Sequence, residues 1–315
     1  SNYIKDWTQL NIAPGFSNPL GPTGGGFGGY AWSTVVHELG HVIGLGHQGN
    51  YNGDVNFSEE AVFANDSWDI SIMSYVDQTQ NPNFTGRTYT DSSTFKAADL
   101  LALDDLYASQ GYGTSNAFTG DTTYGHNTTI TDGTSAIWNQ LTTWIDSTGF
   151  TIADGAGTDT IDFSDFSANQ QLDLRATEAS STSPYYSTIN GRENNLSIAV
   201  NTIIENATTG SGNDSITGNS AANTLNGGAG NDTLKGNEGA DLFVMSAGSD
   251  VVSDFTSGTD KIGIDYPLTY QLADVGSDMT ITTSDSKVMT LTGINKAAFN
   301  ASTDINYSGA PDATT

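Results

Sequence analysis

Residues 209–253 read TGSGNDSIT-GNSAANTLN-GGAGNDTLK-GNEGADLFV-MSAGSDVVS, which are five consecutive nonapeptides. The sixth position of each is aspartate or asparagine, the eighth is apolar, and the fourth is glycine or alanine. Three classes of position keep one register over five repeats, which chance glycine-rich sequence would not do. The recurring residues are Asp214, Asn223, Asp232, Asp241 and Asp250; Ile216, Leu225, Leu234, Phe243 and Val252; and Gly212, Ala221, Gly230, Gly239 and Gly248.

This repeat predicts a calcium-binding β-roll. Roughly six residues make a turn whose carbonyls and carboxylate bind calcium, and three make a short strand with one side chain inward. Successive turns alternate sides, so Asp214 pairs with Asp232 and Asn223 pairs with Asp241. Asn223 replaces an aspartate, so we expect a weaker or differently bound ion on that side. The predicted ligands in the repeats are Gly210, Gly212, Asp214, Asn223, Gly227, Gly228, Ala229, Gly230, Asp232, Gly236, Gly239, Asp241 and Asp250.

The charge balance supports cation binding. Nine basic residues stand against 36 acidic ones, a net charge of −27, which disfavours nucleic acid and anionic membranes as partners. A solvated acidic surface is the alternative explanation, but aspartate greatly outnumbers glutamate and often lies beside glycine, as tight cation-binding turns require. There are no cysteines, so disulfides and thiolate metal sites are excluded. No stretch approaches the roughly 20 apolar residues that span a bilayer.

A second motif lies near the start of the chain, in the segment HELGHVIGLGH at residues 37–47. On a helix, His37 and His41 lie one turn apart on one face, so both imidazoles can reach one metal ion. Gly44 permits the sharp turn that brings His47 back as a third ligand. Glu38 is angled to one side, where it can act on a water molecule. Incidental helix histidines are the alternative, yet three of the four histidines in the chain occupy this motif.

The chain divides into two parts by pattern. Residues 31–47 are expected to form a helix with a sharp stop, and residues 95–108 an amphipathic helix. Beyond about residue 112 the helical periodicity disappears, and short β-branched runs separated by Thr, Ser, Asn, Asp and Gly predict strands. At 315 residues the chain exceeds the usual size of one core. We therefore predict one domain over residues 1–112 and a second over residues 113–315.

The histidine motif at residues 37–47 and a later segment, Ser71-Ile72-Met73-Ser74-Tyr75, together are similar to the metzincins, whose zinc helix is followed by a methionine turn. With the glycine-aspartate nonapeptides, the chain resembles the serralysins, bacterial secreted zinc proteases with a repeats-in-toxin domain. The resemblance extends from about residue 30 to 265, through residues 99–107, 157–164 and 204–207. It implies an α+β fold: the carboxy-terminal part of a zincin (metzincin) catalytic domain, followed by an all-β parallel β-roll and β-sandwich.

The resemblance also implies roles for individual residues. Glu38 would be the general base on water at the zinc, and Tyr75 would leave the metal to stabilise the oxyanion. Met73 would form an apolar floor, although plain core packing is an alternative. For Tyr75 the alternative is a buried aromatic ring with a satisfied hydroxyl group. The zinc ligands implied are His37, His41, His47 and Tyr75.

Calcium ligands outside the repeats are likewise implied by the resemblance. Residues 118–122 and 154–159 match a site that clamps the junction between the domains. Wet surface residues are the alternative explanation, because charged loop residues are usually only solvated. The residues implied are Phe118, Gly120, Thr122, Asp154, Ala156, Gly157, Asp159, Glu205 and Asp260.

Two functions from different classes follow. The first is a secreted, extracellular, monomeric zinc endopeptidase that cleaves proteins and peptides, with one Zn²⁺, several Ca²⁺ and type I-like secretion implied by the family. The second is a calcium-ordered structural or adhesive module that carries an inert protease remnant. Only 36 residues precede His37, where related catalytic domains have well over a hundred. We therefore expect a missing amino-terminal fragment of the protease as a candidate partner.

Overall fold

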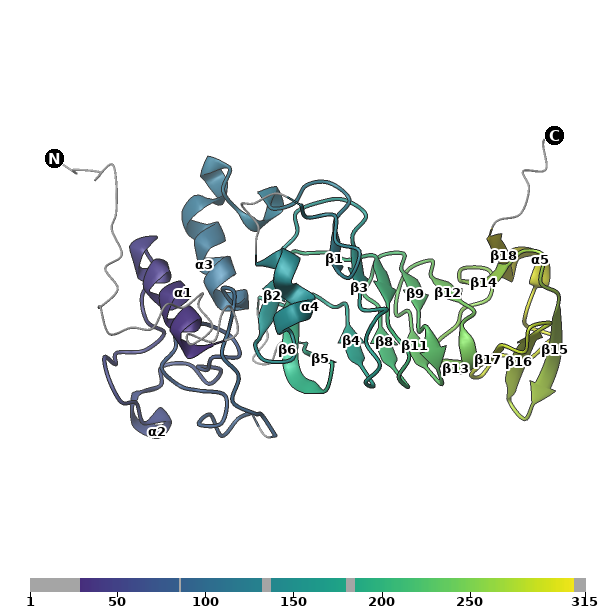
Figure 1. The fold of residues 1–315 in the computed structure, drawn as a ribbon, viewed down its shortest axis with the longest axis horizontal. Helices are drawn as coiled ribbons and strands as arrows, with labels where there is room; N and C mark the ends of the chain where they lie inside the picture. Colours follow the sequence, from purple (N-terminus) through teal and green to yellow (C-terminus); the bar gives the residue numbers. More distant parts are fainter. Residues whose placement is uncertain (1–28, 85, 132–136, 180–184, 309–315) are drawn as a thin grey trace.

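The structure is a computed structural model, and it describes residues 29–84, 86–131, 137–179 and 185–308. The first three helices, α1 to α3, lie at one end of an elongated molecule, and strands stack along its length to the other end, where α5 lies (Figure 1). The helices and turns of 3-10 helix are α1 (Tyr30–Val42), α2 (Phe57–Glu60), α3 (Ala97–Tyr107), η2 (Ala108–Gln110), η3 (Thr114–Asn116), η5 (Trp138–Gln140), α4 (Leu141–Trp144) and α5 (Ala301–Asp304).

Helix α1 is shorter than the predicted helix over residues 31–47, because it ends at Val42. Gly44 has a φ of +105°, a backbone conformation that glycine adopts without the penalty of a Cβ. The amide of Leu45 then donates back to the carbonyl of Gly40 at 2.9 Å, which closes the helix. The chain therefore reverses between the second and third histidines of the motif.

Helix α3 occupies most of the predicted span 95–108, but the expectation of an amphipathic helix is only partly met. Its buried residues are Ala97 and Asp99 in the first turn. Leu106, one of the apolar residues in this span, is 46% exposed. Among the residues that the structure describes, the leucines further along this helix have only partial cover.

Most of the buried apolar side chains among the described residues form two hydrophobic clusters. The small one lies between α1, the methionine turn and α3, and its buried members are Val36, Leu45, Ile72 and Met73. The large one runs through the strand region from Tyr124 to Phe299 and contains the central apolar residue of every repeat. Each of those five side chains has no exposed surface, as the nonapeptide pattern predicts.

Two sheets face each other across the large cluster. One has seven strands in the order β1-β3-β7-β9-β12-β14-β18, and the other has eleven, with β15-β16-β17-β13-β11-β8-β4-β5-β6-β2 on its main path and β10 paired with β13. Leu234 is in parallel register with Ile216 on one side and Val252 on the other. On the opposite sheet Phe243 pairs with Leu225. Successive repeats thus alternate between sheets, which confirms a parallel β-roll.

The strands are short, as three-residue rungs require. In the first half they are β1 (Thr123–Gly125), β2 (Phe150–Ile152), β3 (Thr160–Asp162), β4 (Gln171–Asp173), β5 (Ser187–Ile189), β6 (Arg192–Ile198), β7 (Asn206–Thr208), β8 (Ser215–Thr217) and β9 (Thr224–Asn226). In the second half they are β10 (Ala229–Gly230), β11 (Thr233–Lys235), β12 (Leu242–Val244), β13 (Ala247–Val252), β14 (Lys261–Asp265), β15 (Tyr270–Val275), β16 (Asp278–Thr283), β17 (Val288–Leu291) and β18 (Ile305–Ser308).

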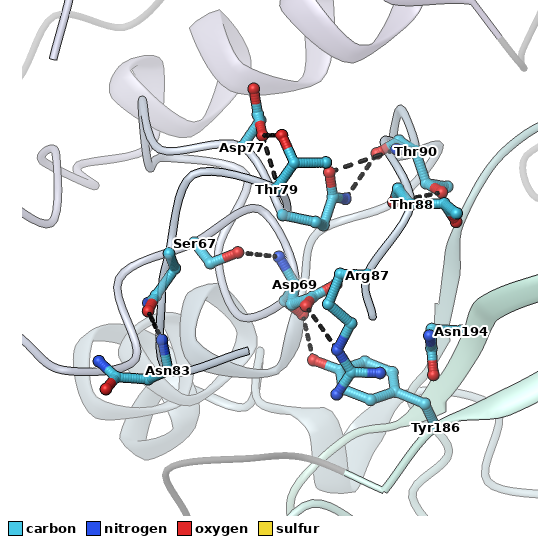
Figure 2. A network of polar contacts seen from close by, with 12 residues as sticks. Ser67, Asp69, Asp77, Thr79, Asn83, Arg87, Thr88, Thr90, Tyr186 and Asn194 are labelled. Carbon is cyan, nitrogen blue, oxygen red and sulfur yellow. Dashed lines mark hydrogen bonds and ion pairs between the residues drawn. The ribbon is translucent and has the colours of Figure 1, made fainter. Parts of the chain in front are cut away.

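A polar junction joins the helical end to the strands. Figure 2 shows Arg87 beside Asp69 and the ring of Tyr186. The guanidinium Nε lies 3.3 Å from Asp69 Oδ2, and its carbon lies 4.4 Å from the centre of the Tyr186 ring. The Tyr186 hydroxyl donates to the carbonyl of Asp69 at 3.0 Å. Arg192 adds a hydrogen bond to the carbonyl of Tyr89 at 2.9 Å. The loop before the methionine turn is therefore tied to the strand region.

Candidate metal centres

Three histidine side chains lie together where α1 ends and the chain turns back. Each Nδ1 lies within hydrogen-bond distance of a main-chain carbonyl, which can only accept. Each Nδ1 therefore carries a proton, and in the neutral ring that a metal binds the lone pair is on Nε2. A metal-binding histidine is oriented in this way by its outer partner. The pairs are His37 with Ile72 at 2.7 Å, His41 with Leu45 at 3.0 Å and His47 with Tyr51 at 3.0 Å.

The free nitrogens of these rings converge. One candidate ligand atom from each histidine lies within 4.8 Å of those from the other two. The Nε2 atoms of His41 and His47 are only 3.0 Å apart, and that of His37 is buried without a hydrogen-bond partner among the described residues. Burial lowers the pKa of His37 and keeps it neutral. Lone pairs that meet at such distances need a cation or a proton between them, so this donor set fits zinc.

The methionine turn is held by one buried carboxylate. Asp99 on α3 accepts hydrogen bonds from the hydroxyl of Ser71 and, at 2.8 Å, from the amide of Ile72. The carbonyl of the same Ile72 orients His37. Burial raises the pKa of Asp99 to about 6, which still leaves it ionised at neutral pH. In the sequence, residues 99–107 stand out only by their resemblance to the serralysins, and no motif predicts this role for Asp99.

Met73 lies under the histidines with 1% of its surface exposed. A Cβ on Gly40 would approach its sulfur to 2.4 Å, so Met73 packs directly on the backbone of α1 between two zinc-ligand candidates. Met73 therefore packs in the core, which was the alternative to an apolar floor in the sequence analysis. It also explains why residue 40 within the histidine motif is glycine, since any side chain there would displace the sulfur.

A cleft of about 540 Å³ lies beside the histidines, and His37 is part of its wall. Glu38 and Tyr75 both line it, together with Tyr30 and Trp68. The ring of Tyr75 lies 4.4 Å from that of His47 and 5.5 Å from that of His37, measured between centroids. Burial raises the pKa of Tyr75, so its hydroxyl stays protonated at neutral pH and can donate a hydrogen bond.

The repeats place buried carboxylates in successive turns on each side of the roll. Oδ1 of Asp232 accepts from the amide of Asp214 at 2.8 Å, and Oδ1 of Asp241 accepts from that of Asn223 at 2.8 Å. The second oxygens of Asp214, Asp232 and Asp241 are buried and have no hydrogen-bond partner in the part of the chain that the structure describes. An unpaired buried carboxylate oxygen is costly. Oxygen-rich turns with such orphaned atoms fit calcium, a hard cation that takes six to eight oxygen ligands.

The acidity of these carboxylates reflects the same burial. Burial raises the pKa of Asp232 to about 7 and that of Asp241 to about 6. The pKa of Asp214 is raised for the same reason. Charged neighbours in the adjacent turns add to the rise at Asp232 and Asp241. Folding without cations thus disfavours the ionised state that calcium would require.

Close packing in the repeats depends on missing side chains. A Cβ on Gly230 would lie 1.9 Å from the carbonyl oxygen of Gly212, eighteen residues earlier in the chain. Gly248 makes the same approach to Gly230, at 1.7 Å. The fourth position of the nonapeptide is therefore small because consecutive turns on one side touch through their backbones.

Other predicted calcium ligands occupy more satisfied positions. One carboxylate oxygen of Asp250 accepts a hydrogen bond from the amide of Asp232, and the other accepts from the Ser246 hydroxyl at 2.6 Å. Asp260 accepts from the amide of Asp241 at 3.0 Å. The side-chain amide of Asn223 donates to the carbonyl of Glu205 at 3.1 Å. These contacts differ from the orphaned oxygens of the best-formed turns.

The outer residues implied by the resemblance also come together. The amide of Thr122 donates to Asp159 at 2.8 Å, and that of Asp159 donates to Glu205 at 2.7 Å. A Cβ on Gly157 would lie 2.7 Å from the carbonyl of Gly120, so these two segments touch. Burial raises the pKa of Asp154 to about 7. Phe118 has a φ of +44° and Ala156 donates its amide to Asp154, at the edge of this cluster.

Comparisons with known proteins bear on both regions. A family profile described as the Peptidase M10 serralysin C terminal matches residues 114–304. The chain belongs to the serralysin family. This serralysin is 39% identical over 215 residues to Metalloprotease AprA of Pseudomonas entomophila (strain L48), covering 67% of this chain and 39% of that protein. It is 38% identical over 197 residues to Serralysin C of Dickeya chrysanthemi (59% and 36%) and 34% identical over 191 residues to Serralysin of Proteus mirabilis (60% and 35%).

The chain spans less than two fifths of the length of these relatives. The matched profile holds every candidate calcium residue, whereas the histidine motif and the methionine turn precede it. No helix in the described parts of this serralysin is long and apolar enough to cross a membrane.

Two further residues of the histidine site were missed by the sequence analysis. Asp66 and Tyr51 hydrogen-bond to each other behind His47, and neither belongs to a motif. Burial raises the pKa of Tyr51 to about 12, so its hydroxyl is a donor. A lone aspartate in a long loop carries no periodic signal, so only the folded geometry identifies it.

Proposed function

We propose that this serralysin chain supplies the zinc-binding and general-base part of a secreted endopeptidase that cleaves proteins and peptides, joined to a calcium-dependent β-roll. The observation that carries the proposal is the set of three imidazoles, each fixed through Nδ1, with one candidate ligand atom from each converging beside a cleft. Three nitrogen ligands leave a coordination position open, which is the arrangement of catalytic zinc.

The chemistry would be shared between the metal and two side chains. Zinc supplies, when bound, a positive charge that polarises a carbonyl group and makes water more acidic. Glu38 takes the proton from the attacking water and returns it to the leaving amine. Tyr75 donates its hydroxyl to the developing oxyanion, which is an electrostatic role. Met73 keeps the region under the histidines apolar and excludes water from it.

The roll would supply folding energy in a calcium-rich, extracellular setting. Carboxylates that are buried with orphaned oxygens oppose folding until a cation binds, so the binding free energy becomes folding free energy. This arrangement suits secretion from a compartment low in calcium, and we propose type I-like export for a chain that acts as a monomer. The amino-terminal part of the protease is the proposed partner of the cleft.

The test is zinc content followed by casein hydrolysis with and without chelator, on this chain alone and on the chain extended to the full length of its relatives. One zinc per chain and hydrolysis that falls by about 10²–10⁴-fold in Glu38→Ala would support the enzyme. Glu38→Ala should keep its zinc, because Glu38 is not among the ligands. Bound zinc with no hydrolysis by the extended protein would instead favour an inert remnant on a structural or adhesive module.

A further inference from the structure

The loop between α2 and α3 contains a fully buried carboxylate that the proposed chemistry does not use. Asp66 has 0% of its surface exposed. Its Oδ1 accepts from the Ser74 hydroxyl at 2.6 Å and from the Tyr51 hydroxyl at 3.1 Å, and its Oδ2 accepts from the same Tyr51 hydroxyl at 3.2 Å. Both of its side-chain partners are neutral hydroxyl groups. Among the described residues, no ion pair involves Asp66.

Tyr51, one of the two side-chain partners of Asp66, contacts His47, the third histidine of the motif. The carbonyl of Tyr51 lies 3.0 Å from Nδ1 of His47 and thereby fixes that ring. The Tyr51 ring stacks on His47 with centroids 5.8 Å apart, and on Tyr75 at 5.3 Å. Tyr51 thus sets the tautomer of one imidazole through its backbone and supports two rings of the site through its side chain. Its hydroxyl is anchored on the carboxylate of Asp66.

Ser74, the other side-chain partner of Asp66, belongs to the methionine turn. Ser74 lies between Met73 and Tyr75, and its hydroxyl accepts from the amide of Val76 at 2.9 Å. Trp68 donates its indole N–H to the Ser74 carbonyl at 2.7 Å. One carboxylate therefore ties the loop after the zinc helix to the turn that carries Tyr75.

The main chain of Asp66 is held as firmly as its side chain. Its carbonyl accepts from Asn81 Nδ2 at 3.0 Å, and its amide donates to the carbonyl of Phe63 at 3.1 Å. Burying a carboxylate that has no cationic partner is unfavourable, and two apolar side chains could pack these loops together at lower cost. The residue is explained better by the direction that its bonds give to Tyr51 and Ser74 than by stability alone.

We propose that Asp66 is a positioning residue of the histidine site, which fixes His47 through Tyr51 and Tyr75 through Ser74. The proposal rests on the proposed zinc function and names a part of the same site. Outer partners of metal ligands typically change metal affinity by about 10–100-fold when they are removed. The affinity for zinc should therefore depend on a residue that never touches the metal.

The experiment compares Tyr51→Phe, Asp66→Asn and the double variant with the wild-type full chain in saturating calcium. Zinc affinity is measured by competition with a chromophoric chelator, the ligand geometry by the absorption spectrum of the cobalt(II) form, and stability by the melting temperature. Tyr51→Phe keeps the stacked ring and the backbone carbonyl and removes the hydroxyl that bonds to Asp66. Tyr186→Phe is the matched control, because it removes a buried tyrosine hydroxyl that bonds to a carbonyl outside the ligand set.

We expect zinc to bind about tenfold more weakly in Tyr51→Phe and in Asp66→Asn, with an altered cobalt spectrum, and no further loss in the double variant. Tyr186→Phe should lower the melting temperature and leave zinc affinity unchanged. Wild-type zinc affinity and an unchanged cobalt spectrum in both single variants, whatever their melting temperatures, would overturn the positioning role. An equal loss in Tyr186→Phe would also overturn it. Failure of the wild type to bind zinc would instead refute the proposed function.

Discussion

The two candidate metal regions hold their ligand side chains in different ways. At the histidine site every Nδ1 has a carbonyl partner, so the three rings are oriented by the protein itself. In the roll the amides of one turn hold one oxygen of each carboxylate, and the second oxygens of Asp214, Asp232 and Asp241 have no partner. Under the proposed function, the first region would receive a metal, and the second would need a metal to be stable. Zinc should therefore control activity, while calcium should control folding.

The largest expected effect comes from removing calcium. Without the cation, burial and mutual repulsion of the carboxylates oppose folding, so the strand region should unfold. Far-UV circular dichroism should lose most of its β signal in a calcium chelator and recover it at millimolar calcium. Removing zinc alone should leave the spectrum nearly unchanged. A β signal that survives complete removal of calcium would contradict the difference between the two regions.

Single carboxylates should sharpen the comparison within the roll. Asp232→Ala removes an orphaned oxygen, and we expect the affinity of that turn for calcium to fall at least tenfold, about 1.4 kcal/mol. Asp250→Ala removes an oxygen that Ser246 already satisfies, so its effect should be smaller. Isothermal titration calorimetry measures both variants under the same conditions. Equal losses would show that the orphaned oxygen does not mark the stronger ligand.

The dependence on pH should have opposite signs with and without calcium. Burial raises the pKa of Asp232 to about 7 and that of Asp241 to about 6, above the value of about 4 for an unfolded aspartate. The folded, calcium-free roll therefore binds more protons than the unfolded chain, and its stability should fall as pH rises from about 4 to about 7. Calcium binding requires the ionised form, so calcium affinity should rise over the same interval. The folded fraction in chelator at each pH, from far-UV circular dichroism, measures the first trend, and calorimetric titration with calcium measures the second; equal slopes would refute the coupling.

Much of this could be predicted because both motifs are local. The nonapeptide register specified the buried residue of each strand, and Ile216, Leu234 and Val252 do lie in one line across a sheet. The histidine spacing with Gly44 anticipated a turn, although the helix ends five residues earlier than expected. These features repeat or lie within one helical turn, so the sequence displays them directly.

The supporting residues could not be predicted in the same way. Asp66 reaches Tyr51 across 15 residues and Asp99 reaches Ser71 across 28, and each connection exists only after the loops have packed. Neither aspartate differs by sequence from the many acidic residues of the surface. The apolar face expected for α3 failed for a related reason, since cover for Leu106 depends on what packs against the helix and not on its periodicity.

The smallest expected effect tests whether the two regions depend on each other. Tyr186→Phe removes one buried hydrogen bond to Asp69 and should lower stability by about 1 kcal/mol, or roughly 2–4 °C in melting temperature. Arg87→Ala removes an ion pair and a contact with the Tyr186 ring and should cost a similar amount. Differential scanning calorimetry in calcium would show one transition if the junction couples the regions, and the variants should separate it into two. Separate transitions already in the wild type would mean that the zinc site gains no support from the roll, and the two regions would then differ in chemistry and also be independent in folding.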